Sequence, residues 1–129
     1  MASRGLTIAV DFDGTCVEHE YPHTGADAEG AAEVLHELVA NDCKLILYTM
    51  RSGSLLDKAV QWFKERKIPL YGINSNPDQD WSDSPKVYAN LYIDDSALGC
   101  PLRFVDGAAR PVVDWQRVRR QLVLDGILD

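Results

Sequence analysis

Two carboxylates two positions apart follow a short apolar run near the start of the chain, in the segment I-A-V-D-F-D-G-T. Asp11 and Asp13 can lie on one side of an extended backbone, and Gly14 lets the chain turn tightly after them. An ionised carboxylate can attack phosphorus, while a second carboxylic acid can protonate the leaving oxygen and later activate water. The pair therefore indicates phosphoryl chemistry, although Asp-x-Asp-Gly is also common in ordinary turns.

A second acidic pair, Asp94 and Asp95, follows the apolar run N-L-Y-I. Four carboxylates at one place repel each other, by about 4 kcal/mol for a pair about 4 Å apart at an effective dielectric near 20. Either a bound divalent cation or a retained proton relieves this repulsion. Because no His or Cys stands at these positions, the oxygen ligands favour Mg²⁺ over zinc.

Groups that could contact a phosphate begin at the last residue of the run K-L-I-L-Y-T. Thr49 offers a hydroxyl and nearby N–H groups, and we expect Met50 and Arg51 beside it to contact the substrate, with Arg51 clamping a carboxylate or a second phosphate. A lysine is also needed to offset the charge of the phosphoryl group. Lys86, just before N-L-Y-I, is better placed for this than Lys58.

The apolar pattern predicts elements that bring these residues together. Short apolar runs predict strands over 6–10, 44–49, 70–73 and 90–93 and an extended piece over 111–113. Helical spacing predicts helices over about 27–41, from about 56 to the E-R-K segment at 65–67, and after Asp114. Thr24 or Asp27 is expected to cap the first helix, and Asp114 the last. Alternating strands and helices predict an α/β fold with a parallel sheet, whose strand ends meet at the edge where ligands bind.

The four segments match, in order, the motifs of a known family. D-F-D-G-T-C-V resembles the first motif of the haloacid-dehalogenase-like hydrolases, and L-I-L-Y-T, Lys86 and Y-I-D-D are similar to the second, third and fourth. The resemblance covers residues 6 to about 100. It implies a Rossmann-like parallel sheet with helices on both faces, and Mg²⁺-dependent hydrolysis of a phosphate monoester through an aspartyl-phosphate.

The resemblance also implies a role for each residue. Asp11 would be the nucleophile and Asp13 the general acid and base, with Thr49 and Lys86 on the phosphoryl group. The metal ligands would be the Asp11 carboxylate, the Asp13 backbone carbonyl and the acidic pair Asp94 and Asp95, of which Asp94 is expected to bind directly.

Many members of this family carry an inserted cap domain. Here the gaps at 15–27 and 74–89 are only loops, so we expect one domain over 1–129 without a cap and with an open site. An open site admits a small or a macromolecular phosphorylated substrate, or a second copy of the chain acting as a lid.

The composition of the chain restricts its expected partners and cellular compartment. The net charge of −7, from 13 Lys and Arg against 20 Asp and Glu, argues against binding nucleic acid through its phosphates. Three widely spaced cysteines without a C-x-x-C pair predict a reducing, cytoplasmic compartment. No apolar run is long enough for a membrane span, and M-A-S-R-G is not followed by a leader-like core.

Two other functions stay open at this point. A receiver-like phospho-signalling module also uses acids, Mg²⁺, a Thr or Ser and a Lys on a parallel sheet, but its phosphorylated Asp follows the third strand, and here that strand ends at Ile73. A member of the family that has lost catalysis would serve as a binding subunit. The loop residues His19, His23 and Trp81 are candidates for substrate recognition, and the alternative is that they are ordinary solvent-exposed loop residues.

Overall fold

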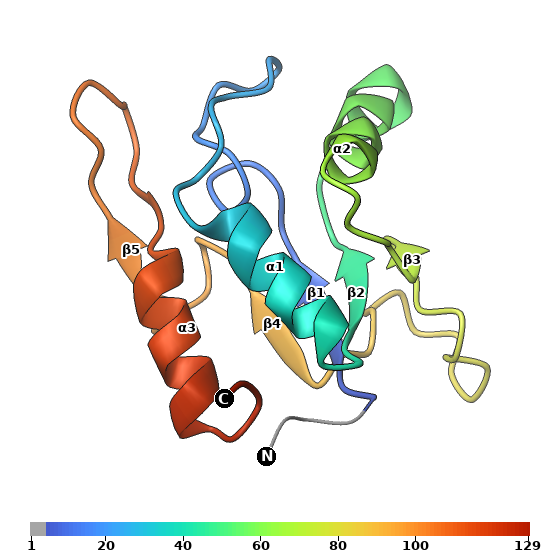
Figure 1. The fold of residues 1–129 in the computed structure, drawn as a ribbon. Coiled ribbons are helices and arrows are strands. Elements are labelled where there is room, and N and C mark those ends of the chain that lie inside the picture. The colour runs from blue at the N-terminus through green and yellow to red at the C-terminus, as the bar shows by residue number, and fades with distance from the viewer. Residues whose placement is uncertain (1–4) are drawn as a thin grey trace.

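The computed structural model describes residues 5–129, so most of the M-A-S-R-G segment lies outside the described residues. Within this range, no helix is long and apolar enough to cross a membrane. The elements, in chain order (Figure 1), are β1 (Thr7–Val10), α1 (Ala31–Ala40), β2 (Lys44–Leu47), α2 (Gly53–Glu65), β3 (Gly72–Ile73), β4 (Leu91–Ile93), β5 (Leu102–Arg103), β6 (Val112–Val113) and α3 (Trp115–Leu124).

Four parallel strands form the central sheet in the order β3-β2-β1-β4. In its centre, Ile8 of β1 lies opposite Leu45 of β2 and Leu91 of β4. All four residues of β1 are buried, as continuous apolar strands of parallel sheets are. The prediction of a Rossmann-like α/β fold without a cap domain is confirmed.

The helices are arranged differently from the expectation of helices on both faces. Buried residues of α1, α2 and α3 belong to one core cluster with Ile8, Val10 and Phe12. Ala9 and Ile46 point to the opposite face of the sheet, because side chains alternate along a strand, and they are buried outside this cluster. The chain adds β2 beside β1 and then β3 beside β2, always toward the same edge of the sheet. Right-handed crossovers between these strands therefore place α1 and α2 on the same face. The return from β3 to β4 crosses the other face through residues 74–90, which contain no helix.

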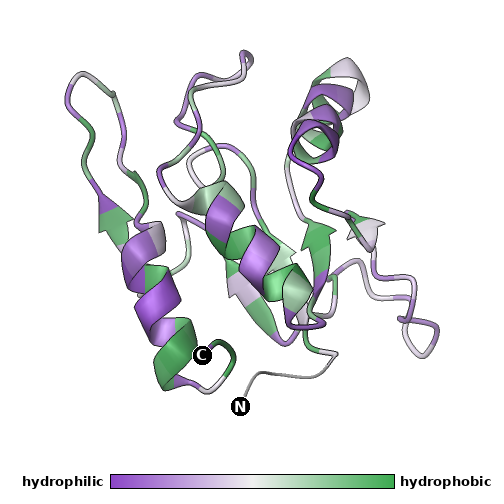
Figure 2. Cartoon of the chain, viewed as in Figure 1, coloured by the Kyte–Doolittle hydropathy of each residue, from purple (hydrophilic) through white to green (hydrophobic). Residues whose placement is uncertain are grey.

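The helix surfaces agree with this arrangement. The helices alternate hydrophilic and hydrophobic residues, while β2 is largely hydrophobic (Figure 2). On the outer side, Arg119 of α3 forms two hydrogen bonds with the Glu37 carboxylate of α1, at 2.7 and 2.9 Å. One face of each helix therefore packs on the sheet, and polar contacts join the neighbouring helices α1 and α3.

The capping prediction is wrong for the first helix and right for the last. Gly30, in the left-handed region at φ 84°, precedes α1. Asp27 instead accepts hydrogen bonds from Trp62 Nε1 at 2.9 Å and from Arg66 at 2.7 and 2.8 Å, which ties the loop to α2. Asp114 caps α3 by accepting from the Arg117 backbone N–H at 3.1 Å.

A hairpin of β5 and β6 was not foreseen; only its second strand was expected to be extended. Leu102 pairs with Val113, and the Val113 N–H donates to the Gly14 carbonyl at 3.0 Å. The buried Trp115 side chain donates from Nε1 to the Thr15 carbonyl at 2.7 Å. The hairpin is thus joined to the turn after β1, and both rise beyond the same end of the sheet (Figure 1).

We expect Trp115→Phe to lower the free energy of unfolding by about 1–3 kcal/mol, because it leaves the Thr15 carbonyl without its buried donor. Urea unfolding measures this loss. Trp81→Phe is the control, since Trp81 is 67% exposed, and it should change stability by less than about 0.5 kcal/mol. Equal effects of the two substitutions would contradict the anchoring role of Trp115.

Candidate functional site

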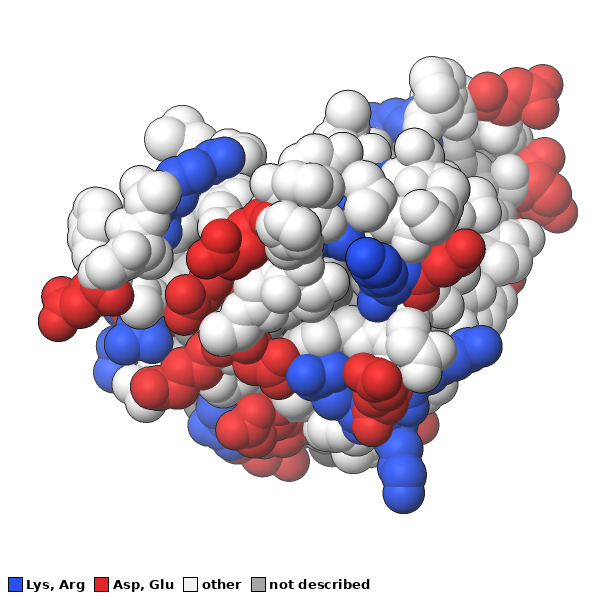
Figure 3. All heavy atoms as spheres, turned by 90° about the horizontal axis from the view of Figure 1, so that it is seen from above, with Lys and Arg blue, Asp and Glu red and all other residues white. Residues whose placement is uncertain are grey.

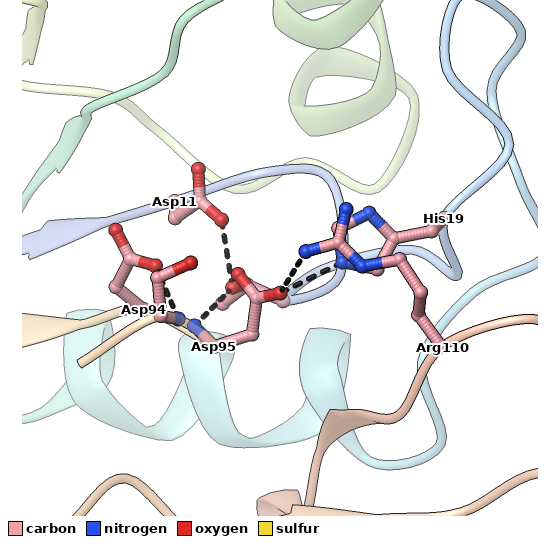
Figure 4. A network of polar contacts seen from close by, with 7 residues as sticks. Asp11, His19, Asp94, Asp95 and Arg110 are labelled. Atoms are coloured by element: carbon pink, nitrogen blue, oxygen red, sulfur yellow. Dashed lines mark hydrogen bonds and ion pairs between the residues drawn. The ribbon is translucent and has the colours of Figure 1, made fainter. Parts of the chain in front are cut away.

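Three carboxylates meet at the carboxyl end of the sheet (Figure 4). Asp11 directly follows β1, and Asp94 and Asp95 directly follow β4, its hydrogen-bonded neighbour. One oxygen from each side chain lies within 4.8 Å of the others. Such an all-oxygen group fits the ligand preference of Mg²⁺, so these residues could hold that ion.

The crowding of these acids changes their protonation. Burial first, then the Asp94 charge and contact with Asp95, raise the pKa of Asp11 from 3.8 to about 8. Burial, together with Asp95, also raises the pKa of Asp94. Without a cation the group therefore retains a proton near neutral pH, and a bound divalent ion would take that proton's place.

The Thr15 side chain joins the two acidic segments. Its buried hydroxyl donates to Asp11 Oδ2 at 3.0 Å and accepts from the Asp95 backbone N–H at 3.2 Å. This contact fixes the orientation of the Asp11 carboxylate relative to the loop after β4. Thr15 stood in the first motif, but nothing in the sequence indicated this double contact.

His19 reaches the same group from the loop after β1. Its Nε2 lies 2.7 Å from Asp95 Oδ2, with both side chains largely buried. Gly14, at φ +82°, makes room for this pair, because a side-chain carbon there would overlap both the His19 ring and the Asp95 carboxylate. His19 therefore contacts a candidate metal ligand, a more specific place than the substrate recognition considered from sequence.

The sequence predicted that Arg51 contacts the substrate, but the structure places its side chain inside the protein. It is 1% exposed, and its guanidinium donates to both Asp13 oxygens at 2.7 and 2.8 Å and to the His23 and Leu55 carbonyls. It also lies over the Phe12 ring, 4.9 Å from the ring centre. With its donors bonded inside the protein, Arg51 holds Asp13 at the site and cannot clamp a substrate group.

Asp13 itself lines the pocket, but its carboxylate is not among the three that converge. This agrees with the sequence interpretation, in which only the Asp13 backbone carbonyl binds the metal. The Asp13 side chain is paired with Arg51 instead of joining the other three carboxylates. The same loop carries Cys16, whose thiol donates to the Asp11 carbonyl; its burial raises the pKa of the thiol. Cys16 is therefore an inert, packed thiol.

Thr49 and Met50 lie beside the acidic group. The Thr49 hydroxyl accepts from the Arg51 backbone N–H at 3.1 Å, so its own hydrogen remains to be donated. The Thr49 N–H donates to Asn74 Oδ1 at 2.8 Å and is therefore not available to a phosphate. Met50 is 96% exposed at the rim.

The two lysine candidates lie away from this place. Lys86 is exposed, with its Nζ 5.9 Å from the centre of the Tyr92 ring, and it lines a different, polar pocket formed by residues 74–87. Lys58 is exposed on α2. Trp81 packs against Tyr88 and is likewise absent from the lining of the acidic pocket.

The acidic pocket has a volume of about 360 Å³, within the range of roughly 300–1,000 Å³ typical of small-molecule sites. Seen from the carboxyl end of the sheet, acidic and basic side chains are intermixed (Figure 3). The lining residues are Asp11, Asp13, His19, Tyr21, Thr49, Met50, Asp94, Asp95, Ser96 and Arg110.

Comparison with known proteins gives one informative likeness. No family model and no curated protein matches the chain. Among solved structures, a conserved protein from Bacteroides thetaiotaomicron is 35% identical, with a TM-score of 0.76, over 95% of this chain and 92% of that one. This similarity covers the elements that carry the site and names no activity.

We expect the metal-free protein to lose stability as the pH rises from about 4 to about 8. In this window the folded state still holds the Asp11 proton, because its pKa is about 8, whereas the unfolded chain, near 3.8, has released it. Raising the pH therefore favours unfolding. Thermal unfolding in a chelator measures the trend.

Asp11→Asn provides the control for this pH dependence, because an amide does not titrate. Its unfolding temperature should fall less over the same window, and saturating Mg²⁺ should reduce the slope of the unchanged protein. The same slope in the variant and in the unchanged protein would show that Asp11 is not the group responsible.

Gly14→Ala should weaken Mg²⁺ binding about tenfold or more, because it displaces the His19–Asp95 pair. Gly107→Ala is a matched control: Gly107 has φ +83° but open space around it, so only backbone strain of about 1–2 kcal/mol is expected. Titration calorimetry with Mg²⁺ gives both affinities. A similar loss of affinity in both variants would mean that strain alone is responsible.

Proposed function

This chain belongs to the same family as the conserved Bacteroides thetaiotaomicron protein, and we propose that it is a Mg²⁺-dependent phosphatase of the haloacid-dehalogenase-like type. It would hydrolyse a phosphate monoester through an aspartyl-phosphate on Asp11. The observation that carries the proposal is the meeting of Asp11, Asp94 and Asp95 within 4.8 Å, with Asp13 lining the same pocket.

Asp11 is suited to nucleophilic attack. The Thr15 hydroxyl holds its Oδ2 at 3.0 Å, which leaves the carboxylate in one orientation toward the pocket. Bound Mg²⁺, held by Asp11, Asp94 and Asp95, would favour the ionised acids and polarise the phosphoryl oxygens. The Thr49 hydroxyl hydrogen is available to donate to a phosphoryl oxygen.

Asp13 is suited to proton transfer by its position. Its carboxylate lines the pocket, and the buried Arg51 guanidinium holds it in one orientation through hydrogen bonds of 2.8 and 2.7 Å. From there it would give a proton to the leaving oxygen and later take one from the attacking water.

The alternatives find less support in this geometry. A receiver would carry its reactive acid after β3, but β3 lies at the edge of the sheet and the acids follow β1 and β4. A binding subunit without catalysis would not need Asp13 beside the other three acids. The proposal includes a phosphorylated substrate as partner and, because of the cysteine pattern, a cytoplasmic location.

Asp11→Asn should lower turnover of p-nitrophenyl phosphate with Mg²⁺ by at least about 1,000-fold, because the nucleophile is lost. Asp13→Asn should lower it by about 100-fold or more, the usual contribution of general acid–base catalysis. Asp57→Asn, an exposed acid on α2, is the control and should be fully active. Release of p-nitrophenol measures all three.

The remaining outcomes separate the alternatives. Full activity of Asp11→Asn would exclude Asp11 as the nucleophile. A wild-type protein that binds Mg²⁺ but turns over no phosphate ester would favour a binding subunit. A stable phosphorylated form after treatment with acetyl phosphate would favour the receiver-like module.

A further inference from the structure

Arg110 lies on the hairpin between β5 and β6, at the rim of the acidic pocket. Its side chain is 60% exposed, and its Nη2 is 3.9 Å from Asp95 Oδ2. Within residues 5–129 its guanidinium makes this long ion pair and no hydrogen bond, so the N–H donors remain available to a ligand. Arg110 is thus free to bind an anion that enters the pocket.

The other cationic side chains considered for the site are not free to bind an anion in this pocket. Arg51 is buried and bonded to Asp13, and Lys86 lines a different pocket. Among the described residues that line the acidic pocket, Arg110 is the only Lys or Arg. Because the carboxylates of Asp11, Asp94 and Asp95 together exceed the charge of one divalent ion, an anionic substrate needs this further cation.

The position of Arg110 indicates which part of a substrate it would meet. It approaches Asp95 from the side away from Asp11 (Figure 4), so it lies beyond the place of the reacting phosphoryl group. The pocket is large enough for more than that group, and Tyr21 and Met50 offer apolar surface at its rim. The neighbouring Val113 is fixed to Gly14, which ties the hairpin to the reacting centre.

We propose that Arg110 binds a second oxyanion of the substrate, a carboxylate or a further phosphate carried by the leaving group. This inference rests on the proposed function, which accounts for the first phosphate. The substrate class is therefore a phosphate monoester with two anionic ends joined by a small apolar skeleton.

Binding of unreactive phosphonates tests the subsite without requiring turnover. With Mg²⁺ present, calorimetry compares phenylphosphonate with 4-carboxyphenylphosphonate and with 1,4-phenylenebisphosphonate. We expect at least one doubly anionic ligand to bind about tenfold more tightly than phenylphosphonate, as a charged hydrogen bond provides. Whichever of the two gains more identifies the second anion as a carboxylate or a phosphate.

Arg110→Ala should abolish this tenfold preference and Arg110→Lys should restore part of it, while Arg120→Ala, an exposed arginine on α3, should retain it. A preference unchanged in Arg110→Ala, or no preference in the wild-type protein, would overturn the inference. Turnover of phenyl phosphate is measured separately. Its absence would count against the proposed function, whereas a preference that depends on Arg110 would still support the subsite.

Discussion

Electrostatic repulsion between carboxylates at one end of the sheet is the constraint on which this structure depends. Asp11, Asp94 and Asp95 are held together although their charges oppose it, and burial together with this repulsion raises the pKa of Asp11. They stay close because the buried strand β1 is paired with β4, and the ends of these two strands cannot separate without breaking the sheet. The contacts of Thr15 and His19 then orient the acids, so core packing sustains an arrangement that is unfavourable by itself.

The fourth carboxylate is stabilised by different means. Asp13 is paired with the buried guanidinium of Arg51, which also bonds the His23 carbonyl and lies over the Phe12 ring. A buried arginine needs such partners, since an unpaired charge there is costly. The ion pair thus separates Asp13 from the other acids and leaves them to share one cation.

Local patterns in the sequence were enough for the strands, the parallel sheet and the acidic edge, because continuous apolar runs such as β1 are distinctive. They were not enough where distant segments meet. The hairpin consists of strands of two residues each and depends on a contact between Val113 and Gly14, so Arg110 gave no signal. Arg51 was predicted to clamp a substrate group because the carboxylate that pairs with it, Asp13, lies far away in the sequence.

Because the chain has no inserted cap domain, the walls of the site are formed by two segments that lie on either side of the first motif. The loop that carries His19 forms one wall, and the β5–β6 hairpin with Arg110 forms another. Both are joined to the turn at Gly14 and Thr15, the hairpin through Val113 and the adjoining Trp115. A change in the hairpin tip can therefore alter what enters the pocket while the strands keep the acids in place, which separates specificity from chemistry within one small domain.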